Sequence, residues 1–139
     1  MICGLYQAAP ALAEKGVHVA SLDEKPGIQA LEDAHPRVVM KPGHLEKREF
    51  EYIRHGTQCL LASMDVATGS ILAAHISATR KEEDFLNLVR ATVEAAPEAR
   101  WYLVVDNLNS HQSASLVEWV ADQLEFDADL GTKAQRGVL

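Results

Sequence analysis

Two aspartates follow apolar segments of strand type, and they are the residues of this sequence best placed to do chemistry. Asp23 comes directly after the run 18–22, and Asp106 comes directly after the uninterrupted apolar run 101–105. In open α/β sheets, ligand sites form outside the carboxyl ends of the strands. Two carboxylates brought together there by adjacent parallel strands are hard oxygen ligands, which suit Mg²⁺ or Mn²⁺. The alternative is that each aspartate simply ends a strand and begins a turn.

Paired metal ions about 4 Å apart activate an attacking oxygen and stabilise the leaving one in phosphodiester chemistry. Another two-carboxylate phosphotransfer enzyme on a related fold is disfavoured. Neither Asp23 nor Asp106 stands in an Asp-x-Asp pair, and the sequence has no Gly-rich phosphate loop.

The elements that must position these aspartates follow from the pattern of apolar residues. Residues 1–16 predict an N-terminal arm or short helix, and residues 28–56 have no clear period and predict a long loop. The segment 58–76 predicts a hairpin around Gly69, and residues 79–82 fit a capping box before a helix. The run 101–105 predicts a strand buried on both faces. A second helix is expected, with these residues on one side: Leu116, Val117, Val120, Ala121 and Leu124.

Two antiparallel strands followed by a helical crossover indicate an α/β fold, a mixed sheet with helices on its faces. We expect residues 17–139 to form this domain, preceded by the N-terminal segment 1–16. The periodic pattern stops after Leu124, so we expect the fold to be incomplete at its C-terminal end.

Composition limits the classes of function. The 139 residues are 47% apolar, enough for one domain with a core, and no apolar run is long enough for a membrane span. Net charge is −7, which argues against a general nucleic-acid coat protein, but the segment 36–55 is basic overall. Cys3 and Cys59 have no CxxC partner and are expected to be reduced thiols, with Cys59 buried in a strand. We expect a cytoplasmic protein.

Four stretches of the sequence resemble the DDE transposases of the insertion-sequence branch allied to the mariner superfamily. The resemblance runs from about Ile2 to Leu139, in family order, and is carried by HVASLDEKPGIQALE (18–32), KREFEYIRHGT (47–57), LLASMDVATGSILA (60–73) and VVDNLNSHQS (104–113). It implies a ribonuclease-H-like fold in which Asp23 and Asp106 ligate two catalytic Mg²⁺ or Mn²⁺ ions. Such enzymes cut transposon ends by attack of water and then join the freed 3′-hydroxyl to target DNA. The resemblance therefore also implies DNA as partner and a bacterial, nucleoid-associated protein.

The resemblance assigns weaker roles to other residues. Glu24 is a possible outer ligand or a solvated turn residue. The motif around Asp106 offers groups that would hydrogen-bond to the metal ligands or face the DNA, although turn formation and helix capping explain them equally; these are Asn107, Asn109 and His111. Three basic residues either contact phosphates or form a solvated charged face; these are Lys47, Arg48 and Arg54. We expect His35, His44 and His55 to be exposed polar groups and His75 to be a satisfied sheet residue.

The family's third carboxylate, a glutamate on a later helix, has no good counterpart here. The acids that follow Asp106 are Glu118, Asp122, Glu125, Asp127 and Asp129, and none is a good substitute. We therefore expect a truncated catalytic core that is a poor nuclease by itself. The competing hypothesis is a non-catalytic, self-associating assembly module, because an unpaired strand edge or exposed apolar face favours dimers. We expect a homo-oligomer.

Overall fold

The structure is a computed structural model, and it describes residues 2–35, 39–46, 51–106, 113–133 and 136–137. The elements of these residues, in chain order, are α1 (Ile2–Ala13), β1 (Val17–Asp33), β2 (Tyr52–Asp65), β3 (Ile71–Ser77), α2 (Glu82–Glu94), β4 (Arg100–Val104), α3 (Ala114–Gln123), β5 (Gly131–Thr132) and β6 (Arg136–Gly137). Helix α1 lies within the segment 1–16, for which an N-terminal arm or short helix was expected. Expectations that concern residues 36–38, 47–50 and 107–112 lie outside the described residues.

Strands β1 to β4 form a mixed sheet, which confirms the predicted α/β fold. The strand order is β3-β2-β1-β4, in which β1 pairs antiparallel with β2 and parallel with β4. The hairpin predicted around Gly69 is present as β2 and β3, and Gly69 has a φ of 75° in its turn. Helix α2 is the crossover that lets β4 return parallel to β1.

The hydrophobic core lies between one face of this sheet and helices α2 and α3. Its buried members come from β1, β2 and α2; they are Ala20, Leu22, Cys59, Leu61, Phe85, Leu88 and Val89. Trp101 and Leu103 of β4 pack against this cluster from the sheet. Because side chains alternate along a strand, Ser21 points to the opposite face, where the Tyr6 hydroxyl of α1 donates a hydrogen bond to its Oγ at 3.1 Å. Helices thus lie on both faces of β1.

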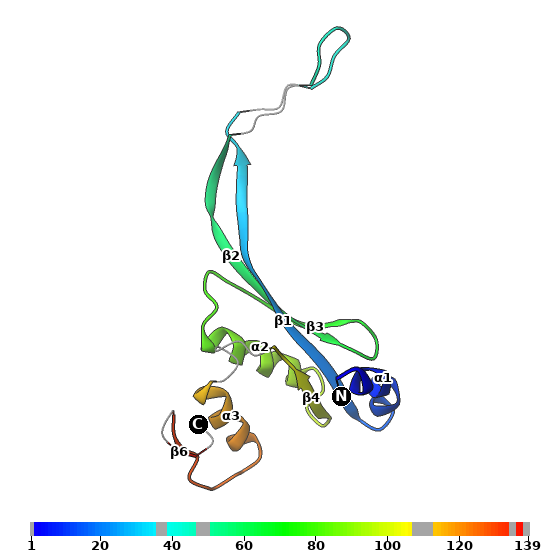
Figure 1. Ribbon diagram of the computed structural model, residues 1–139, viewed down its shortest axis with the longest axis vertical. Helices are drawn as coiled ribbons and strands as arrows, with labels where there is room; N and C mark the ends of the chain where they lie inside the picture. Colours follow the sequence, from blue (N-terminus) through cyan, green and yellow to red (C-terminus); the bar gives the residue numbers. More distant parts are fainter. Residues whose placement is uncertain (1, 36–38, 47–50, 107–112, 134–135, 138–139) are drawn as a thin grey trace.

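The prediction of a long loop over residues 28–56 was wrong for much of that segment. Strands β1 and β2 continue as a two-stranded ribbon that extends away from the helices (Figure 1). We call residues 25–33 with 52–58 the arm, and the remainder of the described helices and sheet the body. All of the described arm residues are exposed to solvent, which explains the missing sequence period: no buried face imposes one.

The strand that the run 18–22 predicts does not end at Asp23, and Pro26-Gly27 form a β-bulge within it. The pairing shifts register between Lys25 and Ile28, and Gly27 has a φ of 69°. Proline lacks an N–H and is tolerated at bulges, and glycine supplies the left-handed backbone. A second shift lies between Gln29 and Leu31, where the partner strand carries Gly56 with a φ of 109°. Breaker residues therefore bend this strand without ending it.

Two further expectations required correction. The run 101–105 is not buried on both faces: β4 is the last strand in the sheet order, and Tyr102 is 52% exposed. The capping box of α2 does not pair Thr79 with Glu82 as predicted. Instead the Lys81 N–H donates to Asp84 Oδ2 at 2.8 Å, because the aspartate three residues after the cap reaches back to it.

Helix α3 is shorter and less buried than the pattern predicted. Ala121 is buried and Leu116 packs on the core, but Val120 is 40% exposed and Leu124 follows the helix at 72% exposed. The start of α3 is tied to α2 by Glu82, whose Oε1 accepts hydrogen bonds from the Ser115 N–H and hydroxyl. These bonds lower the pKa of the Glu82 carboxyl.

Candidate functional site

The parallel pairing of β1 with β4 sets the two candidate aspartates at the same level of the sheet. The last paired residues are Ser21 and Val104. Asp23 and Asp106 each lie two residues further along, at the carboxyl ends of this pairing. Both residues are exposed to solvent. The adjacency of two parallel strands that a shared metal site requires is therefore present.

Asp23 belongs to β1 itself, which continues past it into the arm. Its position opposite Ala62 of β2 fixes the backbone on one side. Its carboxylate accepts a hydrogen bond from the Glu24 N–H, which reaches Oδ1 at 2.8 Å. A carboxylate held by a backbone donor has a defined direction, and its other oxygen stays available to a ligand.

A third acidic ligand does not join this pair within the described part of the chain. Among those residues, no group of three or more His, Cys, Asp or Glu side chains could hold a metal ion. Glu118 and Asp122 are exposed on α3, and α3 packs on the core face of the sheet, not on the face of Ser21. Glu125, Asp127 and Asp129 follow that helix.

Glu24 lies on the core face of β1 and takes part in an ion pair. Its Oε1 is 2.9 Å from Arg80 NH1, and its side chain is only 10% exposed. Because side chains alternate along a strand, the Glu24 side chain points away from that of Asp23. Glu24 is a largely buried residue of β1 and is therefore not a solvated turn residue. This pairing joins residues far apart in the chain, and the sequence contains no signal for it.

Most of the weaker candidates lie outside the described residues. These are Lys47, Arg48, Asn107, Asn109 and His111. Arg54 is described, and it lies on β2 in the arm. Its guanidinium is 5.6 Å from the centre of the Tyr52 ring, and its NH2 donates to the Tyr52 hydroxyl at 3.4 Å. The arm thus presents an exposed cation and an aromatic ring side by side.

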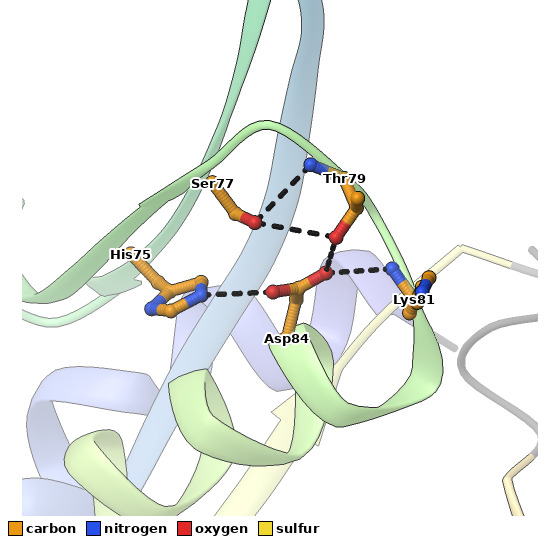
Figure 2. A network of polar contacts seen from close by, with 5 residues as sticks. All are labelled: His75, Ser77, Thr79, Lys81 and Asp84. Carbon is orange, nitrogen blue, oxygen red and sulfur yellow. Dashed lines mark hydrogen bonds and ion pairs between the residues drawn. The ribbon is translucent and has the colours of Figure 1, made fainter.

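The histidines form no metal site within the described residues, and one of them belongs to a helix-capping network. His75 Nε2 lies 3.1 Å from Asp84 Oδ1, and Asp84 Oδ2 accepts from the Thr79 hydroxyl at 2.7 Å (Figure 2). The expectation of a satisfied sheet residue is confirmed. The Thr79 hydroxyl, the Lys81 N–H and His75 all hydrogen-bond to the carboxylate, so they hold the pKa of Asp84 well below its ordinary value. Of the other histidines, His35 and His44 are exposed. His55 is also at the surface, where its Nε2 lies 2.6 Å from Glu32 Oε2.

The two cysteines are free, as expected, and Cys59 is buried in β2. Burial raises the pKa of the Cys59 thiol, and the nearby Glu24 carboxylate raises it further. A neutral, buried thiol acts as a small apolar residue of the core. Cys59 therefore belongs to the packing of the sheet.

A mixed sheet with an acid just beyond the carboxyl end of the parallel pairing on each of two adjacent strands is the arrangement of the ribonuclease-H-like nucleases. Residues 18–133 match the DDE superfamily endonucleases, and the chain belongs to this family. No curated protein and no solved structure matches the chain. Enzymes of this family generally use divalent metal ions and act on DNA. Of the helices described, none is both long and apolar enough to cross a membrane.

Proposed function

We propose that the chain is part of the catalytic domain of a transposase of the insertion-sequence branch allied to the mariner superfamily. Its activity is metal-dependent cleavage of DNA at transposon ends, followed by strand transfer into target DNA. The observation that supports this most is the parallel pairing of β1 with β4, which brings Asp23 and Asp106 to the same edge of the sheet. Acting on DNA, the protein works in the bacterial nucleoid.

The residues of this edge fit a hard divalent cation. Asp23 and Asp106 supply carboxylate oxygens at exposed positions, which are the ligands that Mg²⁺ and Mn²⁺ prefer. A bound ion supplies electrostatic stabilisation at the scissile phosphate and favours deprotonation of the attacking oxygen. The task of the chain is to bind and orient: the Glu24 N–H fixes the carboxylate of Asp23, and Glu82 holds the start of the helix that follows Asp106.

In this proposal, the third carboxylate ligand that the family uses comes from outside the described residues. Two carboxylates hold a cation less firmly than three, so this chain alone is a poor nuclease. The possible DNA contacts Lys47, Arg48 and Arg54 belong to the arm or to the segment that connects its two strands. Contacts of this kind are electrostatic and weaken as salt rises.

Calorimetric titration with Mn²⁺ tests the metal site. We expect wild-type binding that is lost in Asp23→Asn and in Asp106→Asn. The matched control is Asp122→Asn, which removes an exposed acid from α3 and leaves the edge of the sheet intact. Binding that survives both aspartate variants, or that falls equally in the control, contradicts the site.

A second candidate function is a self-associating assembly module, and the exposed apolar side chains of the arm favour it. Leu31 and Ile53 are 51% and 50% exposed on a ribbon that no other described element covers. A two-stranded ribbon is marginally stable alone, so a second copy that covers it gains apolar burial. Light scattering on the wild type and on Leu31→Ser/Ile53→Ser distinguishes the cases. A dimer that becomes monomeric in the double variant supports the module, and a wild-type monomer contradicts it.

A further inference from the structure

Glu24 is held in an unusual environment for a residue beside a proposed ligand. Its side chain is 10% exposed, and one carboxylate oxygen, Oε2, is buried with no hydrogen-bond partner in the described residues. Its other oxygen lies 2.9 Å from Arg80 NH1. A buried carboxylate requires a compensating charge, so Arg80 is the group that keeps Glu24 on the core face of the sheet.

The backbone of the same residue touches the proposed site. The Glu24 N–H donates to Asp23 Oδ1 at 2.8 Å. A continuous series of contacts therefore leads from the Arg80 guanidinium through the Glu24 side chain and backbone to the carboxylate of Asp23. A rotation of the Glu24 peptide that released its side chain to solvent would also break the bond that orients Asp23.

Arg80 is itself fixed at its backbone. Its neighbours Thr79 and Lys81 both donate hydrogen bonds to the Asp84 carboxylate, which is the network that caps α2 (Figure 2). The location of the pair along β1 is also informative. Glu24 is the last residue of β1 before the arm, where every described residue is exposed. Motion of the arm would reach Asp23 unless the strand were anchored at this point.

We infer that Arg80 and Glu24 are positioning residues that fix the carboxylate of Asp23 for divalent metal binding at the junction of the body and the arm. The inference rests on the proposed function, since it assigns a task to the metal ligand named there. The ion pair anchors β1 to the start of α2, and the Glu24 N–H transmits this anchoring to Asp23 Oδ1.

Mn²⁺ titration of four variants in the full chain tests this inference. Residues that orient a metal ligand typically contribute 10–100-fold to affinity, so we expect Arg80→Ala and Glu24→Ala each to weaken binding about tenfold. The double variant should bind no more weakly than either single variant, because both remove the same contact. Arg80→Lys should retain most of the affinity. The control is Arg90→Ala, another exposed arginine, whose guanidinium lies over the Trp119 ring and not on Glu24.

A measurement without metal separates this inference from the proposed function. Amide hydrogen exchange, followed by NMR, reports whether the Glu24 N–H is bonded to Asp23. We expect faster exchange at this amide in Arg80→Ala and in Asp23→Ala, but not in Arg90→Ala, with thermal midpoints of Arg80→Ala and Arg90→Ala close together. Unchanged exchange in Arg80→Ala overturns the inference, and so does unchanged Mn²⁺ affinity when Asp23→Asn abolishes binding. A wild-type chain that binds no Mn²⁺ overturns the proposed function instead, and the exchange rates then decide the positioning role alone.

Discussion

The inner and outer halves of β1 and β2 have the same backbone pairing but different environments. In the body, Leu22 and Leu61 are 4% and 2% exposed and face the helices. In the arm, the same two strands remain paired, yet no described residue is buried. The hydrogen bonds of the ladder are thus common to both halves, and the burial of apolar area is not. Because burial is the dominant favourable term in folding, we expect the body to unfold cooperatively and the arm to open locally.

Truncation of a leucine in each half gives the largest expected contrast. Leu61→Ala in the body should lower the free energy of unfolding by about 2–5 kcal/mol, because it leaves a cavity in the core. Leu31→Ala in the arm should lower it by less than about 0.5 kcal/mol, since that side chain is half exposed. Urea denaturation of both variants measures the difference. Equal losses would mean that the arm and body form one cooperative unit.

Removal of the carboxylate that caps α2 should have the next largest effect. We expect Asp84→Asn to lower the free energy of unfolding by about 1–2 kcal/mol at pH 7, because it weakens the bonds from Lys81 and Thr79. The Asp84 pKa is lower in the folded chain than in the unfolded one, so this stabilisation is present above about pH 4 and is lost as the pH falls further. Denaturation curves from pH 7 to pH 3 should therefore show the variant and wild type converging in acid. The control is Glu83→Gln, an exposed residue of the same helical turn, and convergence there as well would argue against a specific role for Asp84.

Substitution of the bulge glycine tests the independence of the arm. Gly27→Ala has no steric contact at the new Cβ, but the left-handed backbone costs a non-glycine residue about 1–2 kcal/mol. We expect faster hydrogen exchange in the outer arm and unchanged exchange at Val19 and Leu61. If protection in the body falls by the same factor, the two halves are coupled more strongly than their burial indicates.

The surface pair of the arm should contribute least. Glu32 and His55 lie 2.6 Å apart, but both side chains are more than half exposed. Exposed ion pairs contribute about 0–1 kcal/mol and are screened by salt. Glu32→Gln should therefore change the free energy of unfolding by less than about 0.5 kcal/mol, measured by urea denaturation at low and high salt. A loss above 1 kcal/mol would show that the arm is more rigid than its exposure suggests.

The sequence predicted those parts of the fold that have a buried face and missed those that lack one. The hairpin of β2 and β3, helix α2 and the strand at 100–104 all have apolar patterns that burial requires. The sequence predicts a loop for the outer half of β1 because Pro26 and Gly27 normally end a strand and because no buried face gives this segment a period. The exposed face of β4 was missed because an apolar run does not reveal how many faces are covered.

The candidate site shows the same division. The positions of Asp23 and Asp106 after strand-like runs were visible in the sequence, and so was the requirement that their strands be adjacent. The ion pair of Glu24 with Arg80 was not visible, since the two residues come from elements that meet only in the folded chain. Glu24 lies inside β1 and not in a turn, because the strand continues through Pro26 and Gly27.

The two bulges of the arm also have a genetic consequence. The first adds one residue to β1 and the second adds one residue to β2, so the pairing beyond both returns to the register of the body. Deletion of Gly27 should therefore remove the first bulge and leave a regular ladder in which Ile28 still pairs with Gln58. Deletion of Gly56 should likewise leave Leu31 paired with Arg54. The arm should thus tolerate a single-codon deletion at either glycine, whereas a deletion elsewhere in the arm moves the residues beyond it to the opposite face.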